Sequence, residues 1–171
     1  MTESATQTLT TSIRRARPVE SPVISDLAFR SKAHWGYDQE FLESCREDLT
    51  LSPREVTDKP VYVLVGDDGT IAGFYSLDPA EDGRVELDDL FVDPTFIGKG
   101  GGRRLWEHAV AKARDLGFRE LIIQSDPHAE GFYRAMGAVG AGERESTVTP
   151  GRMLPLLSFA LADAGLSRDQ N

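Results

Sequence analysis

A strand, a glycine-rich turn and a helix follow one another directly between residues 85 and 116. Before the turn, Leu90, Phe91 and Val92 end an apolar run that predicts a buried strand. Pro94 stops this strand because proline has no N–H to continue a ladder. After the turn, apolar residues recur at helical spacing: Leu105, Trp106, Ala109, Val110, Ala113 and Leu116. The unit predicts an α/β fold.

The turn itself suits a phosphate group. Four of the five residues from Gly98 to Gly102 are glycine, so no Cβ atom holds a ligand away from the backbone. The helix that follows adds unpaired N–H groups and the positive end of its dipole. The sequence therefore predicts an anion site where the strand meets the helix.

Two common phosphate loops do not fit this turn. A Walker loop has Ser or Thr after Gly-Lys, but Gly98-Lys99 is followed by Gly100. A dinucleotide fingerprint that began at Gly98 would have Arg103 in place of its third glycine. One that began at Gly100 would have Leu105 there. Both classes of nucleotide loop are excluded.

The rest of the chain predicts an alternation of strands and helices. Strands are expected at 13–16, 61–65, 70–77, 84–92, 121–123, 138–146 and 154–161. Helices are expected from Ser21 to near Gly36, after an Asp38 N-cap, and at 100–116 and 130–136, with a connector at 53–60. Turn signals make strands 61–92 an antiparallel meander. Strand, helix and strand from 84 to 123 imply a parallel pair with a right-handed crossover.

The first two helices are expected to bury one face each. The inward residues are Val23, Ile24, Leu27, Ala28 and Ser31 in the first helix, and Phe41, Leu42, Cys45 and Leu49 in the second. Cys45 is expected to be a core thiol, since buried thiols are usually inert.

Composition bounds the function. The chain has 171 residues, which fit one domain at 12–162 between a disordered tail at 1–11 and a second tail at 163–171. With 28 acidic and 19 basic residues it has no basic stripe for nucleic acid, and its acidity mildly favours amine substrates. No apolar run could span a bilayer, and no signal core opens the chain. A lone cysteine fits a reducing cytoplasm.

Two segments resemble the markers of a known superfamily. Residues 92–105, Val-Asp-Pro-Thr-Phe-Ile-Gly-Lys-Gly-Gly-Gly-Arg-Arg-Leu, resemble the acyl-CoA pyrophosphate loop of the GCN5-related N-acetyltransferase (GNAT) superfamily. Residues 129–138, Ala-Glu-Gly-Phe-Tyr-Arg-Ala-Met-Gly-Ala, are similar to its Ala-x-x-Phe-Tyr-x-x-x-Gly-Phe segment. Ile97 and Ala138 depart from the usual residues without removing a backbone donor. The two markers occur in the order that is typical of the family. The order of the expected strands and helices extends the resemblance to residues 13–161.

The resemblance implies the GNAT fold and its co-substrate. The fold is a mixed central sheet of about six to seven strands, splayed at the cofactor site and flanked by about four helices. Acetyl-CoA would be the co-substrate, and its acetyl group would pass directly to an amine without a metal ion or a covalent intermediate. Members of the family often form homodimers, so the resemblance implies a homodimer here.

The resemblance also assigns the cofactor site. Leu90 would present its N–H to the thioester carbonyl, and Phe91 and Val92 would pair with the pantetheine amides. Asp126 occupies a position that is often Asn and contacts the cofactor. The pyrophosphate would lie on the glycine turn, on Gly98, Lys99, Gly100, Gly101, Gly102 and Arg103.

Tyr133 and Glu86 are the predicted catalytic residues. In the family, the tyrosine of Phe-Tyr commonly protonates the departing thiolate, and some members use a glutamate four residues before the oxyanion donor as base. An amine with a pKa near ~10 must lose a proton before it attacks. A carboxylate with a pKa near ~4.3 needs burial or a water relay to accept that proton. The alternative is that Tyr133 is a core aromatic.

Asp88 is predicted to bind the acceptor or to replace Glu86 as base. Strand alternation puts Glu86, Asp88 and Leu90 on one face unless a bulge intervenes. The alternative is that Glu86, Asp88 and Asp89 are solvated strand charges.

The stretch between the first two helices is the predicted acceptor site. Trp35 and Tyr37 either line an acceptor pocket or close the core as hinge aromatics. Arg152 lies in a stiff loop with two prolines, and either binds an acidic part of the acceptor or caps a neighbouring chain.

The sequence therefore predicts an acetyl-CoA-dependent N-acetyltransferase that acts on the primary amine of a small molecule. The alternatives are transfer to a protein or peptide amine, and a non-catalytic acyl-CoA-binding module.

Overall fold

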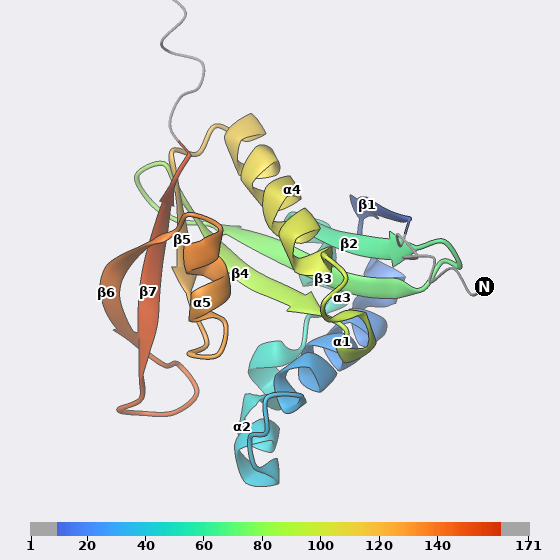
Figure 1. Cartoon of the computed structure of the whole chain (residues 1–171), viewed down its shortest axis with the longest axis horizontal. Coiled ribbons are helices and arrows are strands. Elements are labelled where there is room, and N and C mark those ends of the chain that lie inside the picture. The colour runs from blue at the N-terminus through green and yellow to red at the C-terminus, as the bar shows by residue number, and fades with distance from the viewer. Residues whose placement is uncertain (1–9, 162–171) are drawn as a thin grey trace, which may run out of the picture.

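A seven-stranded sheet forms the centre of the computed structural model, which describes residues 10–161. The strands lie in the order β1-β2-β3-β4-β5-β7-β6 (Figure 1). They are β1 Thr11–Arg15, β2 Val61–Gly66, β3 Ile71–Pro79, β4 Arg84–Val92, β5 Glu120–Gln124, β6 Val139–Glu145 and β7 Met153–Ala160. The antiparallel meander of β2, β3 and β4 is confirmed, and so is the parallel pairing of β4 with β5.

Five α-helices and two 3-10 helices pack around the sheet in the described range. The α-helices are α1 Ser21–Ala33, α2 Gln39–Leu49, α3 Pro53–Asp58, α4 Gly101–Asp115 and α5 Glu130–Ala135. The 3-10 helices are η1 Pro18–Glu20 and η2 Pro94–Phe96. Four of the α-helices agree with the sequence-based prediction, whereas α3 occupies the stretch that was expected to be a connector.

A capping box explains why α3 forms. Ser52 accepts a hydrogen bond from the Glu55 N–H at 3.1 Å, and the Glu55 carboxylate accepts one from the Ser52 N–H at 3.3 Å. Pro53 stands at the first helical position, where its missing N–H costs nothing. Val56 then packs into the core. The prediction of a connector was wrong because it overlooked this start signal.

Two apolar clusters cover the two faces of the sheet. Figure 1 shows α4 and α1 on opposite sides of the sheet. On one face, Leu105 and Ala109 of α4 pack against β3, β4 and β5. On the other face, Ile24 of α1, Cys45 of α2 and Val56 of α3 pack against β2 and β3. Cys45 is 3% exposed, as expected of a core thiol. The sheet therefore separates the helix that follows the glycine turn from the helices of the N-terminal segment.

The sheet opens between β4 and β5. The two strands pair only at Arg84 with Glu120, Val85 with Leu121 and Glu86 with Ile122. Beyond Glu86 they separate, and β5 pairs with β7 on its other side. Figure 1 shows the arm made of β5, β7 and β6 turning away from the arm made of β1 to β4. The predicted splay of the sheet is confirmed.

β4 contains an extra residue. Ser76 of β3 pairs with Asp89, whereas the next residue of β3, Leu77, pairs with Leu87. Asp88 therefore has no partner in the ladder and forms a β-bulge. A bulge shifts the alternation of side chains along the strand by one residue.

The bulge changes which side chains of β4 share a face. In a regular strand Glu86, Asp88 and Leu90 would lie on one face. Leu90 instead packs with Leu87 in the cluster beneath α4. Asp89 lies on the opposite face, toward α1 and α2. The bulge is the exception that the sequence analysis allowed for, so the shared face expected of an uninterrupted strand does not apply here.

Some expected boundaries differ at the N-terminal end. Thr11, which was assigned to the tail, pairs with Gly66 in the ladder of β1 and β2. Val23 was expected to face inward but is 50% exposed. Residues 1–9 of the expected first tail, and all of the expected tail at 163–171, lie outside the described residues. The domain boundaries stay a prediction.

Candidate active site

A cavity of about 740 Å³ occupies the opening in the sheet. Its size lies within the usual range for ligand sites. It brings together most of the predicted site residues: Trp35, Glu86, Asp88, Leu90, Phe91, Val92, Gly98, Gly100, Gly101, Gly102, Arg103, Asp126 and Tyr133. It also includes Arg152, whose role the sequence left open. Lys99 and Tyr37 are not among its lining residues.

The glycine turn enters the cavity wall from the end of β4. Asp93 caps η2, and its carboxylate accepts a hydrogen bond from the Thr95 N–H at 3.0 Å. The same carboxylate pairs with Arg30 of α1 at 2.6 Å, which fixes the turn to the N-terminal helices. α4 then begins at Gly101 with Gly100 as its N-cap residue.

The glycines of the turn are needed for two reasons. Gly98 and Gly100 have φ angles of 83° and 81°, a region that favours glycine, and the space beside them is open. Gly101 lies in the helix, where a Cβ atom would stand 3.0 Å from the Leu64 side chain. The first two glycines shape the turn, and the third lets α4 approach the sheet.

The start of α4 has N–H groups without a partner in the helix. The first hydrogen bond of the helical ladder runs from the Arg104 N–H to the Gly100 carbonyl at 3.1 Å. The N–H groups of Gly101, Gly102 and Arg103 precede it. With the positive end of the helix dipole they form the type of site that binds a diphosphate.

The two basic side chains of the turn differ in position. The Lys99 ammonium lies over the Phe96 ring, 5.3 Å from its centroid, and Lys99 is outside the lining of the cavity. Arg103 lines the cavity, and its guanidinium contacts Glu107 at 3.4 Å. The predicted contacts of Lys99 and Arg103 with the pyrophosphate stay predictions.

The free edge of β4 offers backbone groups to the cavity. Asp93 donates its N–H to the Ala72 carbonyl at the edge of β3, at 2.8 Å. Because successive peptide groups alternate sides along a strand, Phe91 directs its N–H toward β3 as well. Leu90 and Val92 direct theirs toward the opening, where β5 has separated from β4. Leu90 thus has the orientation that an oxyanion donor needs, whereas the peptide groups of Phe91 are used within the sheet.

Tyr133 lies at the inner wall of the cavity. Its side chain is 6% exposed and packs on Trp106, with 5.8 Å between the ring centroids. Burial raises the pKa of Tyr133 above its ordinary value, and the charges of Asp89 and Asp126 act in the same direction. The phenol therefore keeps its proton at neutral pH, which is the state that a general acid requires.

Glu86 and Asp88 are each paired with a cation. Arg144 of β6 contacts Glu86 at 2.9 Å. Lys59 contacts Asp88 at 3.7 Å and Asp78 at 3.8 Å. Burial raises the pKa of Glu86 and of Asp88, and the cation in each pair opposes the rise. The predicted roles of these two carboxylates stay predictions. To act as a base, either carboxylate would have to give up the attraction of its cation.

Asp89 is a candidate that the sequence reasoning missed. It lines the cavity, and its carboxylate accepts a hydrogen bond from the Ser76 hydroxyl at 2.5 Å. Burial, with the charge of Asp88, raises the pKa of Asp89 to about 7. No motif could have singled out Asp89, because it is the bulge that places its side chain on the sheet face toward α1 and α2.

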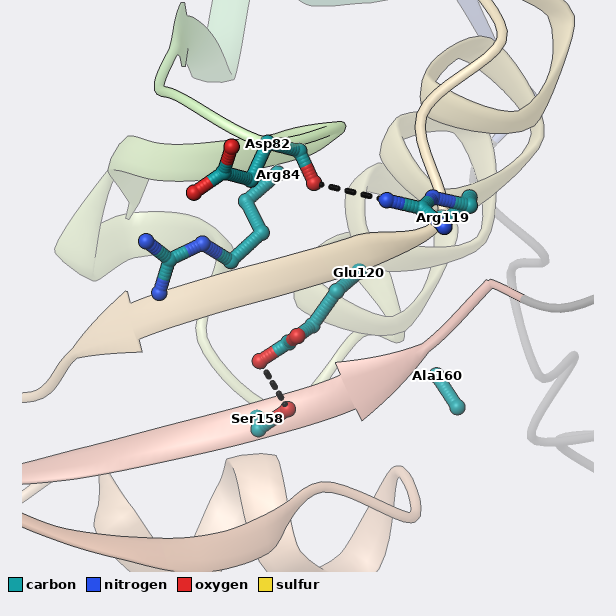
Figure 2. Close-up of a pocket in the computed structure, with 6 residues that line it drawn as sticks. All are labelled: Asp82, Arg84, Arg119, Glu120, Ser158 and Ala160. Atoms are coloured by element: carbon teal, nitrogen blue, oxygen red, sulfur yellow. Dashed lines mark hydrogen bonds between the residues drawn. The ribbon is translucent and has the colours of Figure 1, made fainter.

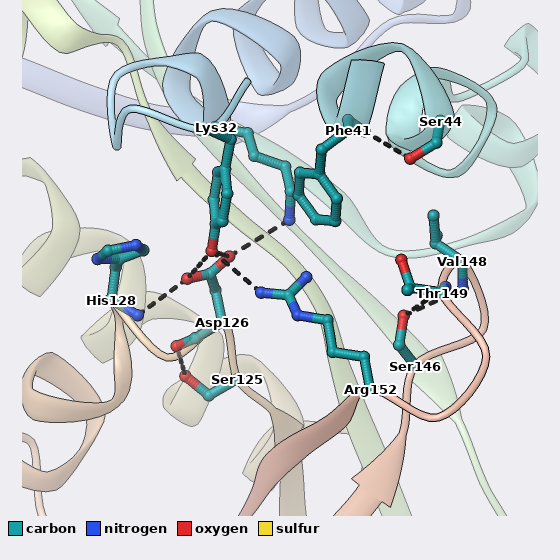
Figure 3. A network of polar contacts seen from close by, with 11 residues as sticks. Lys32, Phe41, Ser44, Ser125, Asp126, His128, Ser146, Val148, Thr149 and Arg152 are labelled. Atoms are coloured by element: carbon teal, nitrogen blue, oxygen red, sulfur yellow. Dashed lines mark hydrogen bonds and ion pairs between the residues drawn. The ribbon is translucent and has the colours of Figure 1, made fainter. Parts of the chain in front are cut away.

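Asp126, which follows β5, connects to α1 and to the segment between α1 and α2 (Figure 3). Its carboxylate accepts hydrogen bonds from the Tyr37 hydroxyl at 2.7 Å, the Lys32 ammonium at 3.3 Å and the His128 N–H at 2.9 Å. Arg152, from the loop between β6 and β7, donates to the Tyr37 hydroxyl at 3.2 Å. Burial opposes ionisation of Asp126, but these bonds lower its pKa below the ordinary value. Its predicted contact with the cofactor stays a prediction.

The two aromatic residues between α1 and α2 differ in their surroundings. Trp35 lines the cavity, is 45% exposed and stacks on His128 with 5.3 Å between the ring centroids. Tyr37 packs on Phe41 at 4.6 Å, and the Arg152 guanidinium lies 4.8 Å from the Phe41 centroid. Trp35 fits the interpretation as a pocket wall, and Tyr37 fits the interpretation as a hinge aromatic.

A second hollow, of about 590 Å³, lies at the other end of β4 and β5 (Figure 2). There Arg119 donates to the Asp82 carbonyl at 3.0 Å, and Ser158 donates to Glu120 at 2.9 Å. Because β4 and β5 are paired at this end, the hollow is remote from the opening. It contains none of the predicted site residues.

Two kinds of feature are missing from residues 10–161. No group of three or more His, Cys, Asp or Glu side chains in this range is arranged to hold a metal ion. None of its helices combines the length and the apolar character needed to cross a membrane.

Sequence comparison places the chain among acetyltransferases. The family model for the acetyltransferase (GNAT) family matches residues 27–138. Peptidyl-lysine N-acetyltransferase YjaB from Escherichia coli is 31% identical over 155 residues, which are 90% of this chain and 98% of that protein. Streptothricin acetyltransferase from Streptomyces lavendulae is 36% identical over 92 residues, which are 52% of this chain and 49% of that protein.

Solved structures share the fold. The PaiA N-acetyltransferase from Thermoplasma acidophilum, in complex with coenzyme A, has a TM-score of 0.71 at 18% identity over 89% of this chain and 99% of that chain. N-acetylglutamate synthase from Neisseria gonorrhoeae, complexed with coenzyme A and N-acetyl-glutamate, has a TM-score of 0.65 at 25% identity over 90% of this chain and 36% of that chain. The region matched by the family contains the opening, the glycine turn and Tyr133. The chain therefore belongs to the acetyltransferase (GNAT) family and is an acetyl-CoA-dependent N-acyltransferase.

Proposed function

We propose that the protein transfers the acetyl group of acetyl-CoA directly to the primary amine of a small molecule. The observation that carries this proposal is the meeting of three kinds of group at the opening: the outward N–H of Leu90, the phenol of Tyr133 and the carboxylates of β4. Formation of an amide from a thioester needs an oxyanion donor, a general acid and a general base.

In this proposal acetyl-CoA lies along the free edge of β4. The Leu90 N–H donates to the thioester carbonyl, and Val92 bonds the pantetheine arm. The diphosphate takes the unpaired N–H groups at 101–103, with open space beside Gly98 and Gly100. The support is physical: unpaired donors at a strand edge and at a helix start are costly unless water or a ligand satisfies them.

The chemistry follows from the arrangement of these groups. A neutral amine attacks the thioester carbon, and the Leu90 N–H stabilises the oxyanion that forms. When the C–S bond breaks, Tyr133 gives its proton to the thiolate. The raised pKa of Tyr133 keeps the phenol protonated until this step, and the enclosed position limits competition from water.

Two features favour a small, cationic acceptor. The contacts of Asp126 with Lys32 and Tyr37, and of Tyr37 with Arg152, tie α1 and the segment after it to the ends of β5 and β7 (Figure 3). We expect these contacts to restrict the space available to a bulky acceptor. Carboxylates of α2 and β4 line the cavity and would attract an ammonium group.

A peptide lysine is the second candidate acceptor. Similarity to peptidyl-lysine N-acetyltransferase YjaB over nearly the whole of both chains favours it. A lysine side chain carries a primary amine at the end of four methylene groups, so it could present that amine to Leu90, Tyr133 and the carboxylates of β4. The two candidates therefore share a mechanism and differ in what surrounds the amine.

An assay of thiol release would decide between them. The purified protein would receive acetyl-CoA with diamines, amino acids or lysine-containing peptides, and peptides with Nε-acetylated lysine would serve as controls. We expect release with small cationic amines. Release with lysyl peptides alone would replace the first candidate with the second. No release above hydrolysis with any amine would contradict both.

Two expectations about the protein in the cell stay predictions. A homodimer is expected from the habit of the family, and a cytoplasmic location from the lone cysteine.

A further inference from the structure

We infer that Asp89 is the base that takes the proton from the acceptor amine, in place of Glu86 or Asp88. The inference rests on the proposed transfer to an amine and adds the identity of the proton acceptor. Three observations carry it: the direction that the bulge gives to Asp89, its contacts, and its position beside the Leu90 N–H.

The bulge directs Asp89 to the acceptor side of the sheet. Asp89 pairs with Ser76, whose hydroxyl bonds its carboxylate at 2.5 Å. This face is the one covered by α1 and α2, and Trp35 from the segment between these helices and Asp48 of α2 line the cavity there. An acceptor that entered beside Trp35 would therefore meet the Asp89 carboxylate.

The contacts of the three carboxylates of β4 differ. Glu86 is paired with Arg144 at 2.9 Å, and Asp88 with Lys59 at 3.7 Å. Asp89 has a hydroxyl as its close partner instead. A carboxylate that is held by a cation loses that attraction when it takes a proton, whereas one held by a hydroxyl keeps most of its hydrogen bonding.

Asp89 lies next to the other reacting groups. It directly precedes Leu90, so its side chain begins beside the N–H that would hold the thioester oxygen. Asp89 and Tyr133 line the same cavity, and the charge of Asp89 adds to the effect of burial in raising the pKa of Tyr133. Base, oxyanion donor and acid thus line one cavity, as direct transfer between bound reactants requires.

The charged groups around Asp89 tune its basicity. Burial raises its pKa to about 7, and the charges of Asp88 and of Asp48 on α2 add to the rise. The hydrogen bond from Ser76 on β3 and the charge of Lys59 oppose it. At neutral pH the carboxylate is therefore partly ionised, and it is a much stronger base than an ordinary one near ~4.

The protons balance over the reaction. Asp89 takes one proton from the ammonium group, and the neutral amine attacks the thioester carbon. The C–N bond forms, the C–S bond breaks with its electron pair on sulfur, and Tyr133 protonates the thiolate. The nitrogen then loses a second proton, which restores the phenol, and Asp89 releases its proton to water. One proton leaves for each amide formed.

The test compares pH profiles of kcat for the full chain and its variants. The variants are Asp89→Asn, the competing-base variant Glu86→Gln, and the control Asp67→Asn in the exposed turn between β2 and β3. We expect the wild-type profile to rise with an inflection near pH 7. Asp89→Asn should lower kcat by ~10²–10⁴-fold and remove that inflection, while acetyl-CoA binds as before. Asp67→Asn should match the wild type.

A weakly basic acceptor separates a catalytic role from a structural one. An amine with a pKa near ~6 is already neutral at pH 8, so the loss in Asp89→Asn should shrink with it. If Asp89→Asn does not fold, Ser76→Ala serves instead. It removes a bond that lowers the pKa of Asp89, so the inflection should move to higher pH.

Two outcomes would overturn the assignment. One is a wild-type rate and profile in Asp89→Asn. The other is an inflection that disappears in Glu86→Gln and persists in Asp89→Asn. Failure of the wild type to release thiol with any amine would instead overturn the proposed function, so the two failures are distinguishable.

Discussion

Tyr133 combines a packed ring with a hydroxyl at the cavity. The ring lies against Trp106 and Phe132 at centroid distances of 5.8 and 5.2 Å. The resemblance predicted a general acid, and the alternative from residue type was a core aromatic. The side chain has features of both, because its packing is what keeps the phenol dry and its pKa high.

Replacement of the Tyr133 hydroxyl should separate chemistry from binding. In Tyr133→Phe the ring still fills its site, but the thiolate loses its proton donor, so kcat should fall by ~10²–10⁴-fold. The dissociation constant of acetyl-CoA, measured by calorimetry, should change by less than about twofold, which is the usual variation when a substitution leaves the binding contacts intact. Tyr62→Phe, which lies outside the cavity lining, is the matched control. Equal kcat in both variants would remove Tyr133 from the mechanism.

The bulge in β4 is the feature of this site that could not be predicted from the sequence. Glu86, Asp88 and Leu90 were all found by motif and spacing, and all line the cavity. They would share a face only in a strand without a bulge, and the one unpaired residue of β4 shifts the alternation. Nothing in the run Asp88-Asp89 signals which residue is extra. The geometry of the carboxylates therefore needed the structure.

The glycine turn should be sensitive to substitution at a position with positive φ. Gly100→Ala places a side chain at φ 81° in open space, so the cost is backbone strain of roughly 1–2 kcal/mol without a clash. Gly131→Ala, in α5 and equally open, should be neutral or slightly stabilising, as expected for alanine in a helix. Urea unfolding measures both. Equal losses of stability would contradict the role given to the Gly100 conformation.

The network around Asp126 should act on the acceptor and not on acetyl-CoA. Asp126→Asn removes the charge that holds Lys32 and weakens the bond to Tyr37, so the connection between the end of β5 and the α1–α2 segment loosens. We expect the KM of the acceptor to rise by roughly tenfold, the scale of one hydrogen bond to a charged group. The dissociation constant of acetyl-CoA should stay unchanged. A selective loss of acetyl-CoA affinity would support the cofactor contact that the resemblance assigned to Asp126.

At the scale of the whole molecule, periodicity and turn signals predicted the seven strands and four of the five α-helices in the described range. They succeeded because each element has its own apolar pattern and its own stop signal. Pro94 follows the end of β4, and Gly117 follows the end of α4. The opening between β4 and β5 came from the resemblance, since pairing over three residues only has no local signature. The bridge made by Asp126 could not be predicted, because it joins residues 89 positions apart.

The partly buried Asp89 should make the stability of the molecule depend on pH. Its pKa rises from an ordinary 3.8 to about 7 in the folded state, so the folded protein keeps a proton that the unfolded chain has lost. This contribution to stability is complete below pH 3.8 and is lost as the pH rises through about 7. Relative to the wild type, Asp89→Asn should therefore gain about 1–3 kcal/mol between pH 4 and pH 8. Urea unfolding across this range measures the difference, and a constant difference would contradict the raised pKa.

Amide hydrogen exchange, resolved by residue with NMR, tests most directly whether acetyl-CoA lies in the opening. The N–H groups of Leu90 and Val92, and those at 101–103, have no partner in a strand or helix and should exchange rapidly in the free protein. Saturating acetyl-CoA should slow exchange at these amides, while Phe91, bonded within the sheet, is slow throughout. Unchanged exchange at Leu90 and at the start of α4, with protection elsewhere, would contradict the account.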